Sequence, residues 1–216
     1  MTSRTRTAVA GLAAAIAATA LLAAPAAHAA TVQCGDGCAA LDNLIYGPSD
    51  VIAVAGASGT QAHTGQPVAL LAAGSSNQGE DWVLIDEGTV SDFYRAGLVS
   101  AGLNLHYGND EAYEYDYVPY GVDSGQCLGV AGIAGNGAPV SLQPCGVSAH
   151  TLWVADTADQ YQRQIPYING SDTDFSYPYV LTADTAGITM TTRMLTGGNG
   201  VIDDGQYWAT LYGVLP

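Results

Sequence analysis

The chain has 216 residues, of which 20 are Asp or Glu and only 5 are Lys or Arg, so its formal net charge at pH 7 is −15. This excess of carboxylates excludes proteins that bind nucleic acid or an anionic membrane face, because both partners require a basic surface. All five basic residues are arginines, which also excludes mechanisms that depend on a lysine.

The first thirty residues have the features of a secretory signal peptide. Two arginines precede an apolar, alanine-rich run, and the small residues Ala27-His28-Ala29 suit a signal peptidase. We therefore predict that residues 1–30 are cleaved and that the protein is secreted. No later apolar run is long enough to span a bilayer. Residues 31–40 are predicted to be a tether ahead of a single domain, residues 41–216.

The first predicted repeat covers residues 41–86 and consists of short apolar runs separated by turns. These runs are Val54-Ala55-Gly56-x-x-Gly59 and Gly65-x-Pro67-Val68-x-Leu70, and Trp82 follows them. Runs of this length, bounded by glycine and proline, indicate β-strands. A further apolar run that ends at Tyr46 precedes them, so the repeat is expected to hold four strands.

Residues 88–115 have no counterpart elsewhere in the chain and are predicted to be an insertion. Its end alternates at period two between tyrosines and carboxylates, which is a strand signal. We expect an extra hairpin that leads into the second repeat, although an alternative alignment starts that repeat at Gly102. The side chains of Tyr113, Tyr115 and Tyr117 form either an aromatic contact surface or a layer that packs on the domain.

The pattern returns twice after the insertion. Residues 117–156 contain Val130-Ala131-Gly132-x-x-Gly135 and Gly137-x-Pro139-Val140-x-Leu142, and residues 165–216 contain a weaker copy that closes on Gln206-Tyr207-Trp208. Four short strands cannot bury a core by themselves, so three copies, or twelve strands, must share one. We expect the tryptophan that closes each copy to lie in this core: Trp82, Trp153 and Trp208.

Four cysteines in an exported chain are expected to form disulfides. Three connectivities are open, of which we favour the two local bonds. Cys34 and Cys38 would close a short ring that contains two glycines, and Cys127 and Cys145 lie on neighbouring strands of one repeat. No cysteine or histidine lies at a zinc-like spacing from the first pair, so no metal site is expected.

The repeats resemble those of ricin B-type lectins. The resemblance is carried by Cys127-Leu-x-Val130, Gly137-x-Pro-Val-x-Leu142, Cys145 and the closing tryptophans, and Gln206-Tyr207-Trp208 matches that family's Gln-x-Trp signature. It implies an all-β fold, a β-trefoil of three four-stranded repeats over residues 41–216, here with an inserted hairpin. It also implies a Cys127–Cys145 bond. A closed six-stranded barrel under a hairpin cap would remove exposed sheet edges.

The resemblance also implies where a sugar would bind. In such lectins a carboxylate and an amide hold the hydroxyls, and an aromatic platform packs on the apolar face of the sugar. By position, the carboxylate falls on Ala53, Gly129 and Thr182, the platform on Leu71 and Gln143, and the amide on Glu80, Thr151 and Gln206. Only Gln206 fits, so the usual sugar-site residues are largely missing. The third repeat keeps the best set of candidate carbohydrate-binding residues: Asp184, Asn199, Asp203 and Gln206.

The sequence contains no motif of a known catalytic site, such as a Gly-x-Ser-x-Gly elbow or a His-Glu-x-x-His pair. We therefore expect a secreted, non-catalytic, lectin-like protein that needs no cofactor and whose partner is an extracellular or cell-wall glycan. Two alternatives stay open. One is an extracellular interaction or structural protein that uses the tyrosine-rich insertion, and the other is a β-trefoil protease inhibitor that presents the loop 58–66 or 169–178.

Overall fold

The computed structural model of the protein describes residues 38–73, 78–173, 175–183, 190–195 and 202–212. The predicted signal peptide, most of the predicted tether and the predicted Cys34–Cys38 bond lie outside these residues, as do Asp184 and Asn199. None of the helices within the described ranges is long and apolar enough to cross a membrane.

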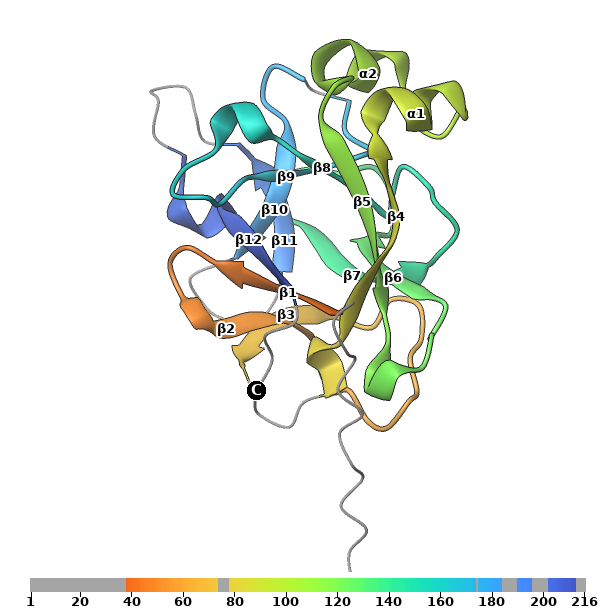
Figure 1. The fold of residues 1–216 in the computed structure, drawn as a ribbon, viewed down its shortest axis with the longest axis vertical. Helices are drawn as coiled ribbons and strands as arrows, with labels where there is room; N and C mark the ends of the chain where they lie inside the picture. Colours follow the sequence, from red (N-terminus) through yellow and green to blue (C-terminus); the bar gives the residue numbers. More distant parts are fainter. Residues whose placement is uncertain (1–37, 74–77, 174, 184–189, 196–201, 213–216) are drawn as a thin grey trace, which may run out of the picture. The chain divides into compact units, whose positions relative to one another are not determined.

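Twelve strands lie in the described residues and fall into three groups of four (Figure 1). The first group is β1 (Cys38–Asn43), β2 (Gly47–Val54), β3 (Val68–Ala72) and β4 (Trp82–Thr89). The second is β5 (Glu111–Tyr117), β6 (Gln126–Val130), β7 (Ala138–Pro144) and β8 (Leu152–Ala155). The third is β9 (Tyr167–Asn169), β10 (Tyr179–Ala183), β11 (Met190–Met194) and β12 (Trp208–Tyr212). Four single-turn 3₁₀ helices lie between strands: η1 (Gln78–Glu80), η2 (Pro119–Gly121), η3 (Thr157–Asp159) and η4 (Asp204–Gln206).

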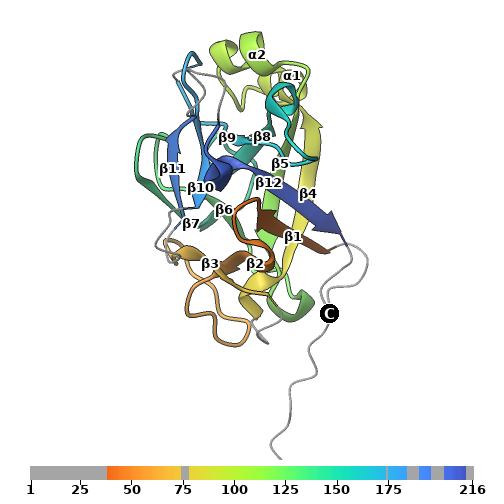
Figure 2. The same ribbon diagram turned by 90° about the vertical axis from the view of Figure 1, so that its left-hand side faces the viewer.

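Six of the strands, the first and last of each group, form a closed barrel (Figures 1 and 2). Strand β1 pairs with β4 and β12, β4 pairs with β5, β5 with β8, and β8 with β9. The ring closes where Ile165, just before β9, exchanges two backbone hydrogen bonds of 2.9 and 3.0 Å with Trp208. A closed barrel has no free edge, which explains how such short strands stay paired.

The other six strands form three hairpins that cap one end of the barrel. Each hairpin is antiparallel: β2 pairs with β3, β6 with β7, and β10 with β11. The hairpins also meet one another, because β7 pairs with β11 and a bridge joins Pro67 to Ser141. Barrel and cap together are the β-trefoil architecture, so the predicted all-β fold is confirmed.

The three tryptophans occupy equivalent positions. Each is 0% exposed and belongs to the same core. Each indole Nε1–H donates to a carbonyl on the second strand of its own repeat: Trp82 to Ile52 at 3.0 Å, Trp153 to Leu128 at 2.9 Å and Trp208 to Leu181 at 2.9 Å. The repeated bond shows the pseudo-threefold symmetry, and it satisfies a polar N–H that burial would otherwise leave without a partner.

Matching glycines set the turn before the third strand in two of the repeats. Gly65 and Gly137 have φ of +82° and +79°, in the left-handed region that favours glycine. Each lies two residues before a proline, Pro67 or Pro139. The Gly-x-Pro-Val spacing therefore encodes a turn that feeds the capping hairpin.

The insertion does not form the predicted extra hairpin. It consists of two short helices, α1 (Val90–Arg95) and α2 (Ala101–Tyr107), between β4 and β5 (Figure 1). Thr89 caps α1 in a capping box with Asp92, and Ser100 caps α2. Helices of six and seven residues are too short to show a clear helical period, so the sequence pattern did not reveal them.

The inserted helices pack on the domain through a second apolar cluster. Val90, Phe93 and Leu103 are buried and lie in one cluster with residues of β8, β9 and β10. The His106 ring stacks on Phe175 at a centroid distance of 5.3 Å. A Cβ on Gly102 would come within 2.3 Å of Phe175, so this glycine allows the ring to approach the helix.

Strand β5 is buried on both faces from Glu114 onward, which contradicts the predicted aromatic contact surface for Tyr115 and Tyr117. Tyr115 is 1% and Tyr117 is 0% exposed, and both belong to the main core. On the other face Glu114 and Asp116 are 0% and 3% exposed. Of the three tyrosines only Tyr113 is partly exposed, and Glu111 at the start of the strand is exposed. The strand starts the second repeat, and Tyr115 and Tyr117 fill the barrel as the alternative interpretation of this run predicted, whereas Tyr113 packs at its edge.

Strand β1 begins at Cys38, where it pairs with Val83, so the last three residues of the predicted tether belong to the barrel. The predicted Cys127–Cys145 bond is confirmed, and it joins β6 to the turn after β7.

Removing this disulfide should lower stability without changing the fold. A Cys127→Ala/Cys145→Ala variant is expected to lose about 3 kcal/mol in the free energy of unfolding, because the bond closes a loop of 18 residues. Urea unfolding followed by tryptophan fluorescence measures the loss. An unchanged midpoint would contradict the expectation, and far-UV circular dichroism serves as the control for a retained fold.

Candidate functional site

The positions that the lectin resemblance assigns to a sugar-binding carboxylate are closed. Ala53 is 0% and Thr182 is 5% exposed, and the Thr182 hydroxyl donates to Val180 O at 3.0 Å. At Gly129 an added Cβ would lie 2.8 Å from the backbone oxygen of His150. The second repeat therefore has no room for any side chain at this position, and a carboxylate would require the backbone to move.

The third-repeat candidates are partly engaged in structure. Gln206 is 1% exposed and its Nε2 donates to Met194 O at 2.9 Å. Asp203 is exposed and accepts from Gly205 N–H at 2.8 Å, which caps η4. The other two candidates, Asp184 and Asn199, lie outside the described residues. Within the part that is described, the Gln206 amide serves the backbone.

A depression of about 300 Å³ lies at the base of the inserted helices. We call it the insertion pocket and define it by five residues at the end of β4, in the first turn of α1 and at the start of β5: Gly88, Thr89, Asp92, Glu111 and Tyr113. The β4–β5 register places Thr89 opposite Glu111 and Gly88 opposite Ala112. The ladder therefore holds both walls of the pocket on rigid backbone.

One wall of the pocket carries an ionised carboxylate. Asp92 Oδ2 accepts from the Thr89 hydroxyl at 2.6 Å and from the Thr89 N–H at 3.0 Å, and Arg95 donates to Oδ1. The hydrogen bonds from Thr89, followed by that from Arg95, hold the pKa of the Asp92 carboxyl below its usual value. Asp92 therefore stays charged at neutral pH.

The other wall combines an aromatic ring with a second carboxylate. The Tyr113 ring packs against Tyr115 and Tyr167, at centroid distances of 6.2 and 6.4 Å, which fixes its orientation. The Tyr113 hydroxyl donates to Glu111 Oε2, and Glu111 is exposed. A ligand in the pocket would meet a ring that is already positioned and a carboxylate that accepts hydrogen bonds.

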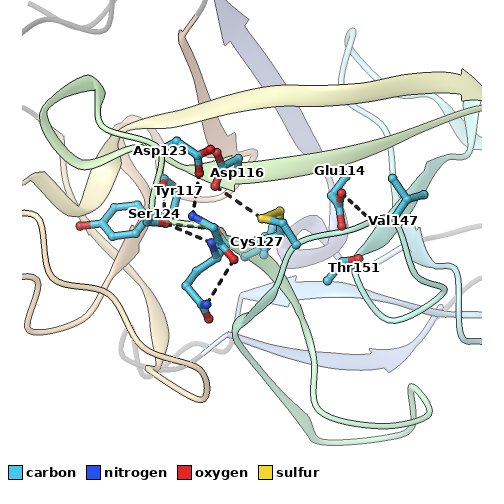
Figure 3. The surroundings of a disulfide bond; sticks show 12 residues. Glu114, Asp116, Tyr117, Asp123, Ser124, Cys127, Val147 and Thr151 are labelled. Carbon is cyan, nitrogen blue, oxygen red and sulfur yellow. Dashed lines mark hydrogen bonds between the residues drawn. A yellow bond between two sulfur atoms is a disulfide. The ribbon is translucent and has the colours of Figure 1, made fainter.

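The surroundings of the disulfide form a second polar cluster, in which Glu114, Asp116 and Thr151 are buried and Asp123 is exposed. Figure 3 shows Asp116 and Asp123 on one side of the bond and Glu114 with Thr151 on the other. Asp116 Oδ1 lies 3.5 Å from Cys145 Sγ. Burial, helped by the neighbouring carboxylates of Asp123 and Glu114, raises the pKa of the Asp116 carboxyl to about 7. The buried Asp116 carboxyl therefore makes the stability of the fold depend on pH.

This cluster does not hold a metal in the form observed. Asp116, Cys127 and Cys145 place potential ligand atoms within 4.8 Å of one another. Both sulfurs are used in the disulfide, however, and only a thiolate is a strong ligand for zinc.

Sequence reasoning missed most of the insertion pocket. Of its five residues it singled out only Tyr113, as part of an aromatic surface. Thr89 and Asp92 follow the spacing of a capping box, and this signal was present in the sequence. The approach of Glu111 to Thr89 depends on strand register, which no local pattern in this segment determines.

Solved structures that resemble the chain now identify the fold. A designed threefold-symmetric protein, ThreeFoil, aligns with a TM-score of 0.54 at 18% identity over 82% of this chain and 99% of its own. A Polyporus squamosus lectin bound to the epitope Neu5Acα2-6Galβ1-4GlcNAc aligns with a TM-score of 0.51 at 10% identity. The fold is a β-trefoil.

The alignments cover most of this chain but less than half of two of the proteins that it resembles. The alignment with the Polyporus squamosus lectin covers 82% of this chain and 49% of the lectin. A mosquitocidal holotoxin aligns with a TM-score of 0.52 at 12% identity over 83% of this chain, but over only 17% of the toxin. Neither a protein-family model nor a curated protein matches the chain. At these identities the likeness concerns the trefoil alone.

Proposed function

We propose that this β-trefoil is a secreted, non-catalytic carbohydrate-binding protein that holds a sugar in the insertion pocket. The observation that carries the proposal is the partly exposed Tyr113 ring, fixed in a depression beside the exposed carboxylate of Glu111. The fold shared with the Polyporus squamosus lectin supports a glycan as the ligand. A volume of about 300 Å³ is at the lower end for ligand sites, which suits one sugar residue.

The pocket offers the two contacts that sugars require. The apolar C–H face of a sugar ring packs on a tyrosine ring, and its hydroxyls bond to polar groups placed around that ring. Glu111 accepts from hydroxyls, and the Tyr113 hydroxyl both donates and accepts. Because the ring is held by Tyr115 and Tyr167, little side-chain entropy is lost on binding.

The family's own positions serve this role poorly in the present chain. The carboxylate positions carry Ala53, Gly129 and Thr182, and the Gln206 amide is bonded to Met194 O. The insertion pocket is therefore a better candidate for the sugar site than these positions.

The chemistry of the pocket favours binding over hydrolysis. A glycosidase needs one carboxyl group that keeps its proton near neutral pH. The lowered pKa of Asp92 works against this role, because its hydrogen bonds stabilise the charged form.

Loss of the tyrosine ring should weaken sugar binding. A Tyr113→Leu variant is expected to bind its glycan about tenfold more weakly, since the stacking contact contributes about 1.4 kcal/mol. A glycan array on the wild-type protein identifies the ligand, and isothermal titration calorimetry then measures the affinities. Tyr113→Phe keeps the ring and should retain most of the affinity.

Tyr161→Leu is the matched control, because Tyr161 is 49% exposed and is not among the residues that line the pocket. Thermal unfolding of all three variants checks that they are folded. Unchanged binding by Tyr113→Leu, or an equal loss in Tyr161→Leu, would move the sugar to another site. Absence of binding to any glycan at about millimolar concentration would exclude carbohydrate binding altogether.

A further inference from the structure

The charges around the insertion pocket are predominantly negative. Asp92 and Glu111 line it, and the adjacent cation, Arg95, is paired with Asp92 and has a side chain that is 73% exposed. The remaining described arginines lie elsewhere in the chain, Arg163 before β9 and Arg193 on β11. Within the described residues the pocket therefore presents no unpaired cation to an acidic sugar.

We infer that the insertion pocket selects sugars that carry a free amino group, over their N-acetylated and acidic counterparts. This inference rests on the proposed function, since it names the class of sugar for that same site. The ligand is then a glycan that contains deacetylated amino sugar, in which a positively charged ammonium group replaces a hydroxyl or an acetamide.

Glu111 is the residue that makes the distinction. Both oxygens of Asp92 already accept hydrogen bonds, from Thr89 and from Arg95, so Asp92 contributes mainly its charge. Glu111 is exposed and accepts from the Tyr113 hydroxyl at the pocket, so an ammonium group can reach its carboxylate from solvent. An ammonium group has three donors, which suit Glu111 and the Tyr113 hydroxyl together.

The Tyr113 ring strengthens the same preference. A cation beside the face of an aromatic ring is attracted by about 0.5 to 1 kcal/mol at an exposed site. An acetamide lacks the charge, and a carboxylate would be repelled by Asp92 and Glu111. The whole chain carries a formal charge of −15, which adds a long-range attraction for cationic glycans at low ionic strength.

The test compares three oligosaccharides of matched length on the full protein. A fully deacetylated glucosamine hexamer, its N-acetylated counterpart and a galacturonic acid hexamer are titrated by calorimetry at about pH 6 in low salt. The glucosamine hexamer is expected to bind about fivefold more tightly than the acetylated one, as an exposed charge contact of about 1 kcal/mol implies. Galacturonic acid should bind most weakly, and added salt should reduce the preference.

A Glu111→Gln variant separates charge from shape. The amide oxygen still accepts from the Tyr113 hydroxyl but carries no charge, so the ratio of the two affinities is the readout, and the fivefold preference for the glucosamine hexamer should fall to about twofold or less. Asp50→Asn is the matched control, because it removes one carboxylate from β2 and not from the pocket. This control should leave the preference unchanged.

Four other outcomes would refute the amino-sugar preference, and one of them would also refute sugar binding. Equal binding of the two glucosamine sugars, or tighter binding of the acidic hexamer, refutes the amino-sugar inference but leaves sugar binding intact. Competition by oligolysine as strong as that by the glucosamine hexamer would identify a general cation site and also refute it. No binding of any of the hexamers, together with an empty glycan array, would remove the proposed function and this inference together.

Discussion

A Trp153→Ala variant is expected to lose about 3 to 5 kcal/mol in the free energy of unfolding, as large aromatic truncations in a core do. Trp153 is 0% exposed and lies in the barrel core. Its removal leaves a cavity and also leaves Leu128 O without the indole N–H that bonds it at 2.9 Å. Chemical unfolding followed by far-UV circular dichroism measures the loss, because the fluorescence reporter itself is changed.

The other two repeats provide an internal comparison for this prediction. Trp82→Ala and Trp208→Ala remove the same contact in the other two repeats and should have similar effects. Trp153→Phe keeps most of the ring volume and should cost less. A loss below about 1 kcal/mol for any one of the three alanine variants would show that its indole does not belong to a shared core.

Stability should rise as the pH falls from about 8 to about 5. The pKa of Asp116 is about 7 in the folded protein against an ordinary value of 3.8, chiefly because burial disfavours the charged form. Between these values the folded state holds a proton that the unfolded state releases, so raising the pH favours unfolding. Asp81 and Asp156, each with a pKa raised by burial to about 6, act in the same direction.

The expected gain from Asp116 is on the order of 2 kcal/mol between about pH 7 and about pH 5, since each pH unit in this window contributes about 1.4 kcal/mol. Above about pH 7 both states are ionised, and this contribution stops changing. Asp116 and Asp123 interact, so the observed midpoint belongs to the pair. Thermal unfolding at a series of pH values measures the effect.

An Asp116→Asn variant should remove most of this dependence. The uncharged amide takes the place of the protonated carboxyl, so the variant is expected to be more stable than the wild type at about pH 8 and similar to it at about pH 5. Asp50 is only partly buried, so an Asp50→Asn variant is the control and should keep the pH dependence. A wild-type protein that is most stable at about pH 8 would contradict the assignment.

Much of the trefoil could be predicted because its signals are local. The Gly-x-Pro-Val spacing reflects a turn that needs positive φ at Gly65 and Gly137, and the tryptophans mark where each repeat closes. Both patterns depend on a few consecutive residues and on strand period, so they can be read without knowledge of distant contacts. The Cys127–Cys145 bond followed from the family resemblance of the same repeat.

The insertion was predicted incorrectly because its structure depends on what it packs against. Helices α1 and α2 are too short to be stable alone, and they persist because Val90, Phe93 and Leu103 bury themselves in a cluster with β8, β9 and β10. On β5 the alternation was read correctly as a strand. Alternation alone does not reveal that a second surface covers the acidic face and buries Glu114 and Asp116.

The sequence by itself thus determined the threefold repeat, the all-β class, the Trp82, Trp153 and Trp208 positions that organise the core, and the acidity that disfavours anionic partners. Only the tertiary structure decided that Gly129 has no room for a carboxylate and that Glu111 faces Thr89 and Asp92 across the insertion pocket. Turn chemistry and strand period act between neighbours in the chain, whereas free space and the approach of charges depend on residues that folding brings together from distant positions.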